Sequence, residues 1–142
     1  MPGAIDVGPL NHAALNTRDV AASVRFYTDL LGFREVPRPN FSFAGSWLYR
    51  DGLGMMLHLI HDERFLAPQP TIETRRHHLA FRVDDFDQAK QKVAARGLSC
   101  VERTLPDHGY RQLFFHDPDG NVIELGEWPP VEEMIRQAPP AD

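Results

Sequence analysis

Apolar and polar residues alternate along two short segments, residues 10–16 and residues 77–83, which predicts a half-buried strand in each. Behind each segment the apolar residues change to the spacing of one face of an α-helix. An aspartate stands where each helix would begin and a glycine where it would end, and these residue types cap the two ends of helices. The capping residues are Asp19 and Gly32 for the first helix, and Asp85 and Gly97 for the second.

Three further strands follow each of these helices in the same pattern. They are expected at about 33–37, 46–50 and 54–60 in the first half, and at about 98–103, 111–116 and 121–126 in the second. Turn-forming Asp, Pro and Gly residues separate the last two strands of each set, at 51–52 and at 117–120. The order of elements is therefore βαβββ twice, and the fold class that it predicts is α+β with two tandem modules.

The two halves also repeat each other in sequence. Residues 47–59 align without a gap with residues 113–125, at an offset of 66 positions. The same offset places His12 on His78, and such self-similarity indicates two copies of one structural unit. We expect a single domain with module 1 at about 8–66, a linker at 67–73, module 2 at about 74–128 and a C-terminal tail at 129–142, which holds a short helix at 131–137.

Four polar side chains fall on one face of the predicted strands. Side chains alternate between the faces of a strand, and the apolar residues take the face that packs on the helices. This leaves His12 and His78 on the opposite face in the first strand of each half, and His58 and Glu124 on it in the last. One such histidine alone is more often an ordinary hydrogen-bonded residue. Two modules related by a pseudo-twofold axis would bring all four to one centre, which predicts a site for one divalent ion: Zn, Ni, Fe, Co or Mn.

Composition narrows the classes of function. The chain has 142 residues, 42% of them hydrophobic, with a formal net charge of -5, which argues against general binding of nucleic acid or of an anionic membrane surface. No apolar run approaches the roughly 20 residues of a membrane span, and no signal peptide is recognisable at the start. The single cysteine, Cys100, fits a reducing compartment. We therefore expect a cytoplasmic protein.

These residues carry a resemblance to a known family. Residues 10–15, 23–33, 78–83 and 115–125 resemble the vicinal oxygen chelate superfamily, which includes glyoxalases, fosfomycin-resistance proteins and extradiol dioxygenases; the chain looks most like small glyoxalase I-like proteins. The resemblance covers about residues 8–128. It implies that the two modules form an open, barrel-like mixed sheet with helices on its outer face, and that the protein acts on a small molecule as a homodimer.

The resemblance also implies roles for the four polar residues. His12, His78 and Glu124 match metal positions of the family. His58 falls where glyoxalase I carries a glutamate that is both ligand and proton carrier, so His58 is expected either to bind the metal or to act as a general base. His58 and Glu124 are thus the candidate catalytic residues.

Four activities are compatible with the resemblance. The expected one is a glyoxalase I-like lyase or isomerase, in which a metal with open positions chelates two adjacent substrate oxygens. An Fe(II) extradiol-type dioxygenase is the alternative, with His58 as an acid or base beside the metal. A fosfomycin-type transferase is less favoured, because Ala14 replaces an expected hydroxyl. A protein that only sequesters a ligand would be expected to lack the metal residues.

The candidate substrate contacts rest on weaker sequence signals than the metal ligands. On the face of the predicted metal ligands, Asn16 and Arg82 are the first candidates. Trp47 and Arg111 are further candidates, together with Arg38 and Tyr110. Phe41 and Phe43 could line a pocket, although aromatic residues more often belong to the core.

Overall fold

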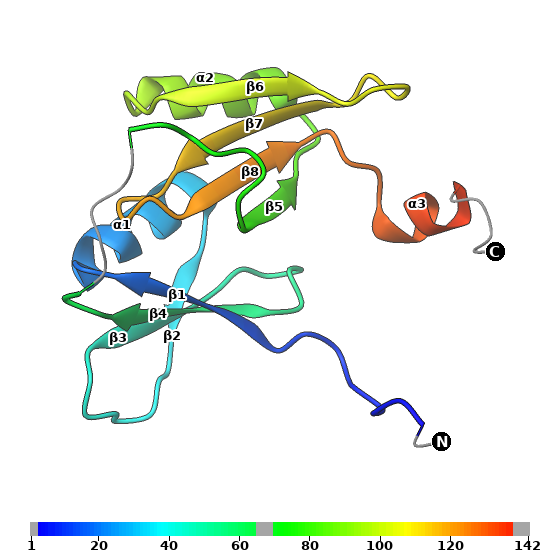
Figure 1. Cartoon of the computed structure of the whole chain (residues 1–142). Helices are drawn as coiled ribbons and strands as arrows, with labels where there is room; N and C mark the ends of the chain where they lie inside the picture. The colour runs from blue at the N-terminus through cyan, green and yellow to red at the C-terminus, as the bar shows by residue number, and fades with distance from the viewer. Residues whose placement is uncertain (1–2, 65–69, 138–142) are drawn as a thin grey trace. The chain divides into compact units, whose positions relative to one another are not determined.

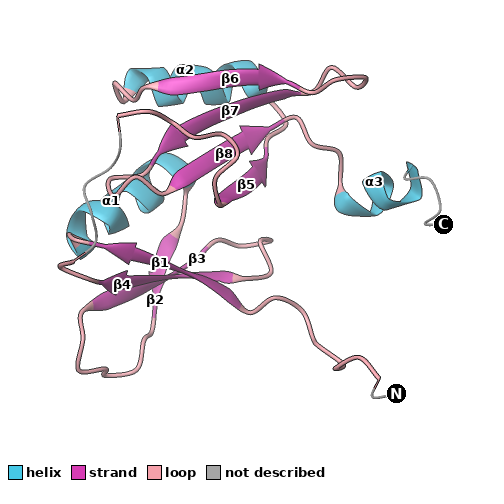
Figure 2. Ribbon diagram, in the orientation of Figure 1, coloured by secondary structure: helices cyan, strands magenta, loops and turns pink. Residues whose placement is uncertain are grey.

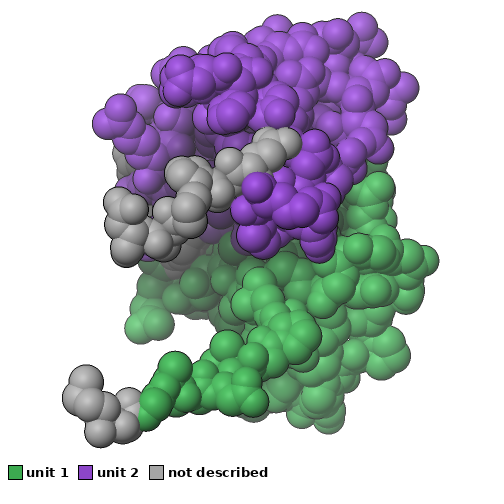
Figure 3. Space-filling model, turned by 90° about the vertical axis from the view of Figure 1, so that its right-hand side faces the viewer, with its two compact units in different colours: residues 1–66 green, residues 67–142 purple. Residues whose placement is uncertain are grey.

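The computed structural model describes residues 3–64 and 70–137. The chain divides into two compact units, residues 1–66 and residues 67–142 (Figure 3). Each unit contains one four-stranded sheet and follows the βαβββ order (Figures 1 and 2). The predicted α+β fold of two tandem modules is therefore confirmed. Part of the predicted linker, residues 67–69, and the end of the tail, residues 138–142, lie outside the described residues.

Unit 1 is built from one helix and four strands. They are β1 (His12–Thr17), α1 (Val20–Leu31), β2 (Arg34–Val36), β3 (Gly45–Tyr49) and β4 (Met56–His61). The strand order is β1-β4-β3-β2, with β1 parallel to β4 and the other pairs antiparallel. Helix α1 contacts β2, β3 and β4, so one face of this sheet is covered by the helix.

Unit 2 repeats this arrangement and adds a helix. Its elements are β5 (His78–Arg82), α2 (Phe86–Ala95), β6 (Cys100–Thr104), β7 (Arg111–His116), β8 (Val122–Gly126) and α3 (Val131–Gln137). The strand order β5-β8-β7-β6, with β5 parallel to β8, is the order of unit 1. Helix α2 contacts β8. Across the described residues, no helix is long and apolar enough to span a membrane.

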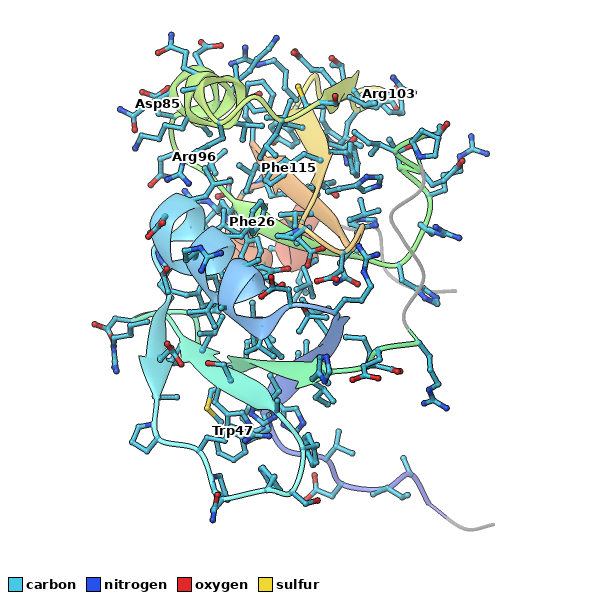
Figure 4. All side chains as sticks on the ribbon, turned by 90° about the vertical axis from the view of Figure 1, so that its left-hand side faces the viewer. Phe26, Trp47, Asp85, Arg96, Arg103 and Phe115 are labelled. Carbon is cyan, nitrogen blue, oxygen red and sulfur yellow. The ribbon has the colours of Figure 1, made fainter. Side chains whose placement is uncertain are left out.

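Three of the four predicted capping residues perform that role, whereas α2 ends one residue earlier than predicted, with Arg96 as its C-cap in place of Gly97. The carboxylate of Asp19 accepts the backbone N–H of Ala22 at 3.0 Å, and the carboxylate of Asp85, at the start of α2 in Figure 4, accepts that of Gln88 at 2.9 Å. Gly32 ends α1 with φ at 73°, a left-handed conformation that glycine adopts without strain. The helices therefore begin where the sequence pattern predicts.

Alternation along the strands separates core from site. Leu57 and Leu59 of β4 are 0% and 1% exposed, and Leu113, Ile123 and Leu125 are buried in unit 2. The residues between them, His58 and Glu124, point to the other face of their sheets.

Strand pairing corrects one part of the sequence repeat. In unit 1, Trp47 of β3 lies opposite His58, whereas in unit 2 it is Phe114 of β7 that lies opposite Glu124. The gapless alignment instead matches Trp47 with Leu113. That match is wrong by one residue, because the connection between the last two strands is one residue shorter in unit 2: residues 117–121 replace residues 50–55.

Candidate functional site

Unit 1 stacks three rings on the face of its sheet that α1 does not cover. The rings of His12 and His58 lie 3.9 Å apart with an interplanar angle of 13°. The ring of Trp47 lies 4.2 Å from that of His58, at 5°, and Figure 4 shows Trp47 on the side of the sheet away from α1. His58 is thus held between two parallel rings.

The imidazole of His58 has an unsatisfied nitrogen. Its side chain is 8% exposed, and its Nε2 has no hydrogen-bond partner among the described residues. Burial, followed by the nearby positive charges of His12 and Arg38, lowers the pKa of His58 below its ordinary value. Leaving such a buried polar atom unpaired costs about 1–3 kcal/mol. A neutral imidazole with a free nitrogen is what a metal ion or a transferred proton requires.

The imidazoles of His12 and His78 are each oriented by a hydrogen bond at Nδ1. Nδ1 of His12 lies 2.7 Å from Oδ1 of Asn11, and Nδ1 of His78 lies 2.6 Å from the backbone carbonyl oxygen of Arg76. Both oxygens only accept, so each Nδ1 donates. An Nδ1 that donates leaves Nε2 as the atom that can bind a metal, which is how proteins usually orient a metal-binding histidine.

Unit 2 pairs its histidine with a buried carboxylate. Glu124 is 1% exposed, and its Oε2 lies 2.9 Å from Nε2 of His78. Because Nδ1 of His78 already donates to the Arg76 carbonyl, a neutral His78 would direct a lone pair at an oxygen that also only accepts. A proton on Nε2 or a bound cation removes this conflict, so the pair fits a metal ion.

The other carboxylate oxygen of Glu124 is held by two donors. Its Oε1 accepts the indole N–H of Trp128 at 2.6 Å and the side-chain N–H of Gln112 at 3.1 Å. Gly126 permits this contact, since a Cβ there would lie 2.5 Å from Nε1 of Trp128. Trp128 and Gln112 were not among the residues predicted from the sequence. Alternation along the strand places Gln112 on the same face as Phe114, and this pattern could have identified Gln112.

Each unit therefore brings together two of the four predicted metal ligands: His12 with His58, and His78 with Glu124. Within neither unit do the described residues gather three His, Cys, Asp or Glu side chains that could hold a metal. A site made of all four requires both units and stays a prediction.

Two predicted substrate-binding arginines have carboxylate partners. Arg82 lies 2.8 Å from Asp84. Arg111 donates to Glu127 at 2.7 Å and to Asp87 at 2.9 Å, and its hydrogen bonds hold the pKa of Glu127 below its ordinary value. Both guanidinium groups are thus already paired with carboxylates of the chain, and their binding of substrate stays a prediction.

The other predicted contacts lie in both units. Asn16 is half-buried on β1, four residues after His12 and on the same face. Tyr110 stacks on His108 with ring centroids 5.5 Å apart. Their roles, like that of Trp47 toward substrate, are likewise untested.

Known proteins resemble the chain across both units. A family model described as the Glyoxalase/Bleomycin resistance protein/Dioxygenase superfamily matches residues 9–125. Glyoxylase I 4 of Arabidopsis thaliana is 33% identical over 119 residues, a match that covers 82% of this chain and 68% of that protein. Glutathione transferase FosA of Serratia marcescens is 30% identical over 118 residues, covering 82% and 78%. The crystal structure of a glyoxalase family protein from Enterococcus faecalis is 29% identical with a TM-score of 0.64, covering 82% and 95%.

Proposed function

Because the chain belongs to the Glyoxalase/Bleomycin resistance protein/Dioxygenase superfamily, we propose that it is a metal-dependent enzyme, a glyoxalase I-like lyase or isomerase of a small molecule with vicinal oxygens. One divalent ion would be held by His12, His58, His78 and Glu124. The observation that carries this proposal is the Nε2 of His58, which is buried without a partner among the described residues. A structural histidine would be expected to have one.

The chain's own groups supply the rest of the chemistry. A divalent ion at these residues would act as a Lewis acid on two adjacent substrate oxygens. Nε2 of His58 either binds that ion or accepts a proton from substrate, and its lowered pKa keeps the ring neutral for both roles. Stacking of Trp47 on His58 fixes the imidazole plane and keeps water from that side.

We further propose that the protein is a homodimer. Large apolar side chains are exposed before β1, where Ile5 is 85% exposed, and in α3, where Ile135 is 67% exposed. Exposed apolar residues of this kind often mark contacts between proteins. Sedimentation-velocity centrifugation tests this proposal, and a species of the mass of one chain at micromolar concentration would contradict it.

A location in the cytoplasm likewise remains a prediction.

Elemental analysis of untagged protein, followed by an assay, tests the proposed activity. About one Ni, Zn, Co or Mn per chain, with metal-dependent turnover of the methylglyoxal–glutathione adduct, is the expected result. About one Fe per chain with oxygen uptake on a catechol would replace the lyase with the dioxygenase alternative. Protein that holds no metal and takes up none on titration would contradict both.

One substitution separates the two roles of His58. His58→Ala should abolish turnover in either case, but loss of the metal marks His58 as a ligand and retention marks it as a base. The matched control is His77→Ala, which removes an exposed histidine next to a predicted ligand and should leave the metal content unchanged.

A further inference from the structure

Arg38 is a half-buried cation without a carboxylate partner among the described residues. It lies in the connection between β2 and β3, where its Nη2 donates to the backbone carbonyl of Phe43 at 2.9 Å. Its Cζ lies 4.8 Å from the ring centre of Phe41 and 5.0 Å from that of Phe43. A guanidinium has five N–H donors, so most of the hydrogen-bonding capacity of Arg38 remains available.

The guanidinium of Arg38 lies on the same face of the sheet as His58. A Cβ at Gly45 would lie 3.1 Å from Nη2 of Arg38, so the guanidinium occupies the space above this glycine. Gly45 and Trp47 share a face because they are two residues apart on β3, and Trp47 lies opposite His58.

A series of flat side chains leads from His58 to Arg38. The Trp47 ring is stacked on His58 at 4.2 Å, the Phe41 ring is 6.2 Å from Trp47, and the Phe43 ring is stacked on Phe41 at 5.0 Å. Phe41 and Phe43 are 42% and 44% exposed, so each offers apolar ring surface to a ligand. Flat apolar groups bind such surfaces by offset stacking.

Arg34, in the same unit, shows what a comparable arginine has that Arg38 lacks. Its Cζ lies 5.4 Å from the ring centre of Tyr49, and its Nη2 lies 3.3 Å from Oδ1 of Asp51. Arg34 thus combines an aromatic contact with a carboxylate from the chain. Arg38 has the aromatic contacts and a hydrogen bond to a backbone carbonyl, but no carboxylate among the described residues.

We propose that Arg38 binds the carboxylate of a substrate whose flat apolar group packs on Phe41, Phe43 and Trp47. The planar fork of a guanidinium matches the two oxygens of a carboxylate in a bidentate pair, and partial burial strengthens the pair. This inference rests on the proposed function, because it names the substrate class of the face that carries His12 and His58.

Ligand titration followed by NMR tests the proposal with the protein as purified. The chain has two tryptophans, so a ¹⁵N-labelled sample gives two indole N–H signals, and Trp47→Phe identifies the one from Trp47. Benzoate supplies the carboxylate and the ring, benzamide the ring alone, acetate the charge alone, and inorganic phosphate another anion. We expect benzoate to shift the Trp47 signal saturably and to bind at least about tenfold more tightly than the other three.

Two arginine variants form the matched comparison. Arg38→Met keeps an apolar stem and should weaken benzoate binding by at least about tenfold, whereas Arg34→Met should bind benzoate like the wild-type protein. Arg38→Lys keeps the charge without the fork and should give an intermediate loss, which guards against misfolding of the methionine variant. Unchanged amide signals elsewhere in each spectrum verify the fold.

Several results would overturn this inference. Equal binding of benzamide would exclude the carboxylate, and equal binding of acetate or phosphate would exclude the flat group. Binding that Arg38→Met leaves intact would exclude Arg38. Metal content is measured on the same sample, so the two proposals can fail separately: metal without benzoate binding overturns the inference alone, and Arg38-dependent binding without metal overturns the proposed enzyme alone.

Discussion

The two units have the same topology but support their candidate metal ligands in different ways. In unit 1 the imidazole of His58 is held by stacking between the rings of His12 and Trp47. In unit 2 the carboxylate of Glu124 is held by hydrogen bonds from Trp128 and Gln112. Aromatic stacking positions a neutral ring without competing for its nitrogens, whereas a buried carboxylate needs donors to offset its loss of water. The chemistry of the ligand therefore dictates what surrounds it.

The two units also differ in which strand of an equivalent residue pair carries a glycine. In unit 1 the paired residues are Gly45 of β3 and Ile60 of β4, and the glycine leaves room for Arg38. At the equivalent pair of unit 2, Gln112 of β7 faces Gly126 of β8, and the glycine leaves room for Trp128. The position of the glycine within this strand pair thus decides which side chain lies beside the ligands. In unit 1 it is the cation of Arg38, and in unit 2 it is the indole of Trp128.

Removal of a ligand from either unit should have the largest effect. Glu124→Gln keeps the shape of the side chain but not its charge, and His12→Ala removes an imidazole. Loss of a residue that only supports a metal ligand lowers metal affinity by about 10–100-fold. Each of these two variants should lower the Zn²⁺ affinity by more than that, as measured by isothermal titration calorimetry. Equal affinity in either variant would remove that residue from the site.

Trp128→Phe should have the next largest effect. It removes the 2.6 Å hydrogen bond to Glu124 and should weaken Zn²⁺ binding by about 10–100-fold. Gly126→Ala should act similarly, because its Cβ displaces the indole, and the two substitutions together should cost less than their sum. Trp47→Phe keeps an aromatic ring on His58 and should lower the Zn²⁺ affinity less than Trp128→Phe does. A larger loss of affinity in Trp47→Phe would contradict the proposed difference between the units.

Gly45→Ala should destabilise the fold of unit 1. The new Cβ would meet the backbone oxygen of Leu59 at 2.3 Å, and overpacking of this kind costs about 1–3 kcal/mol. Urea denaturation measures the loss. Exposed Gly52 has no atom within 4 Å of its Cβ position but a φ of +83°, so Gly52→Ala reports backbone strain alone. Unchanged stability of Gly45→Ala would show that the close approach is relieved.

The smallest effect is expected from Arg111→Met, measured as the urea midpoint at several pH values. Arg111 holds the pKa of Glu127 below the ordinary 4.5, so this interaction stabilises the fold above that pH and is lost as the pH falls through the lowered value. The variant should therefore be less stable at pH 7, and the difference from wild type should shrink toward pH 3. A difference that does not change with pH would assign the effect to packing on Phe86.

Sequence periodicity predicts the elements and the paired ligands because both depend on local spacing. Asp19 and Asp85 cap their helices through contacts three residues away, and alternation alone places His58 and Glu124 opposite the core. The positions of Trp128 and Arg38 could not be predicted from local spacing. The contact of Trp128 depends on space above Gly126 and that of Arg38 on space above Gly45, and both depend on strand register. The repeat misassigned that register by one residue.

The central claim is that both units contribute ligands to one metal site. Equilibrium dialysis against Zn²⁺ tests it most directly, with variants that lose the ligands of one unit at a time. If both units contribute to one site, the wild-type chain should bind about one ion, and both the double variant His12→Ala/His58→Ala and the double variant His78→Ala/Glu124→Gln should bind none. Two ions per wild-type chain, with one retained in each double variant, would show that the units bind metal independently and would contradict the shared site.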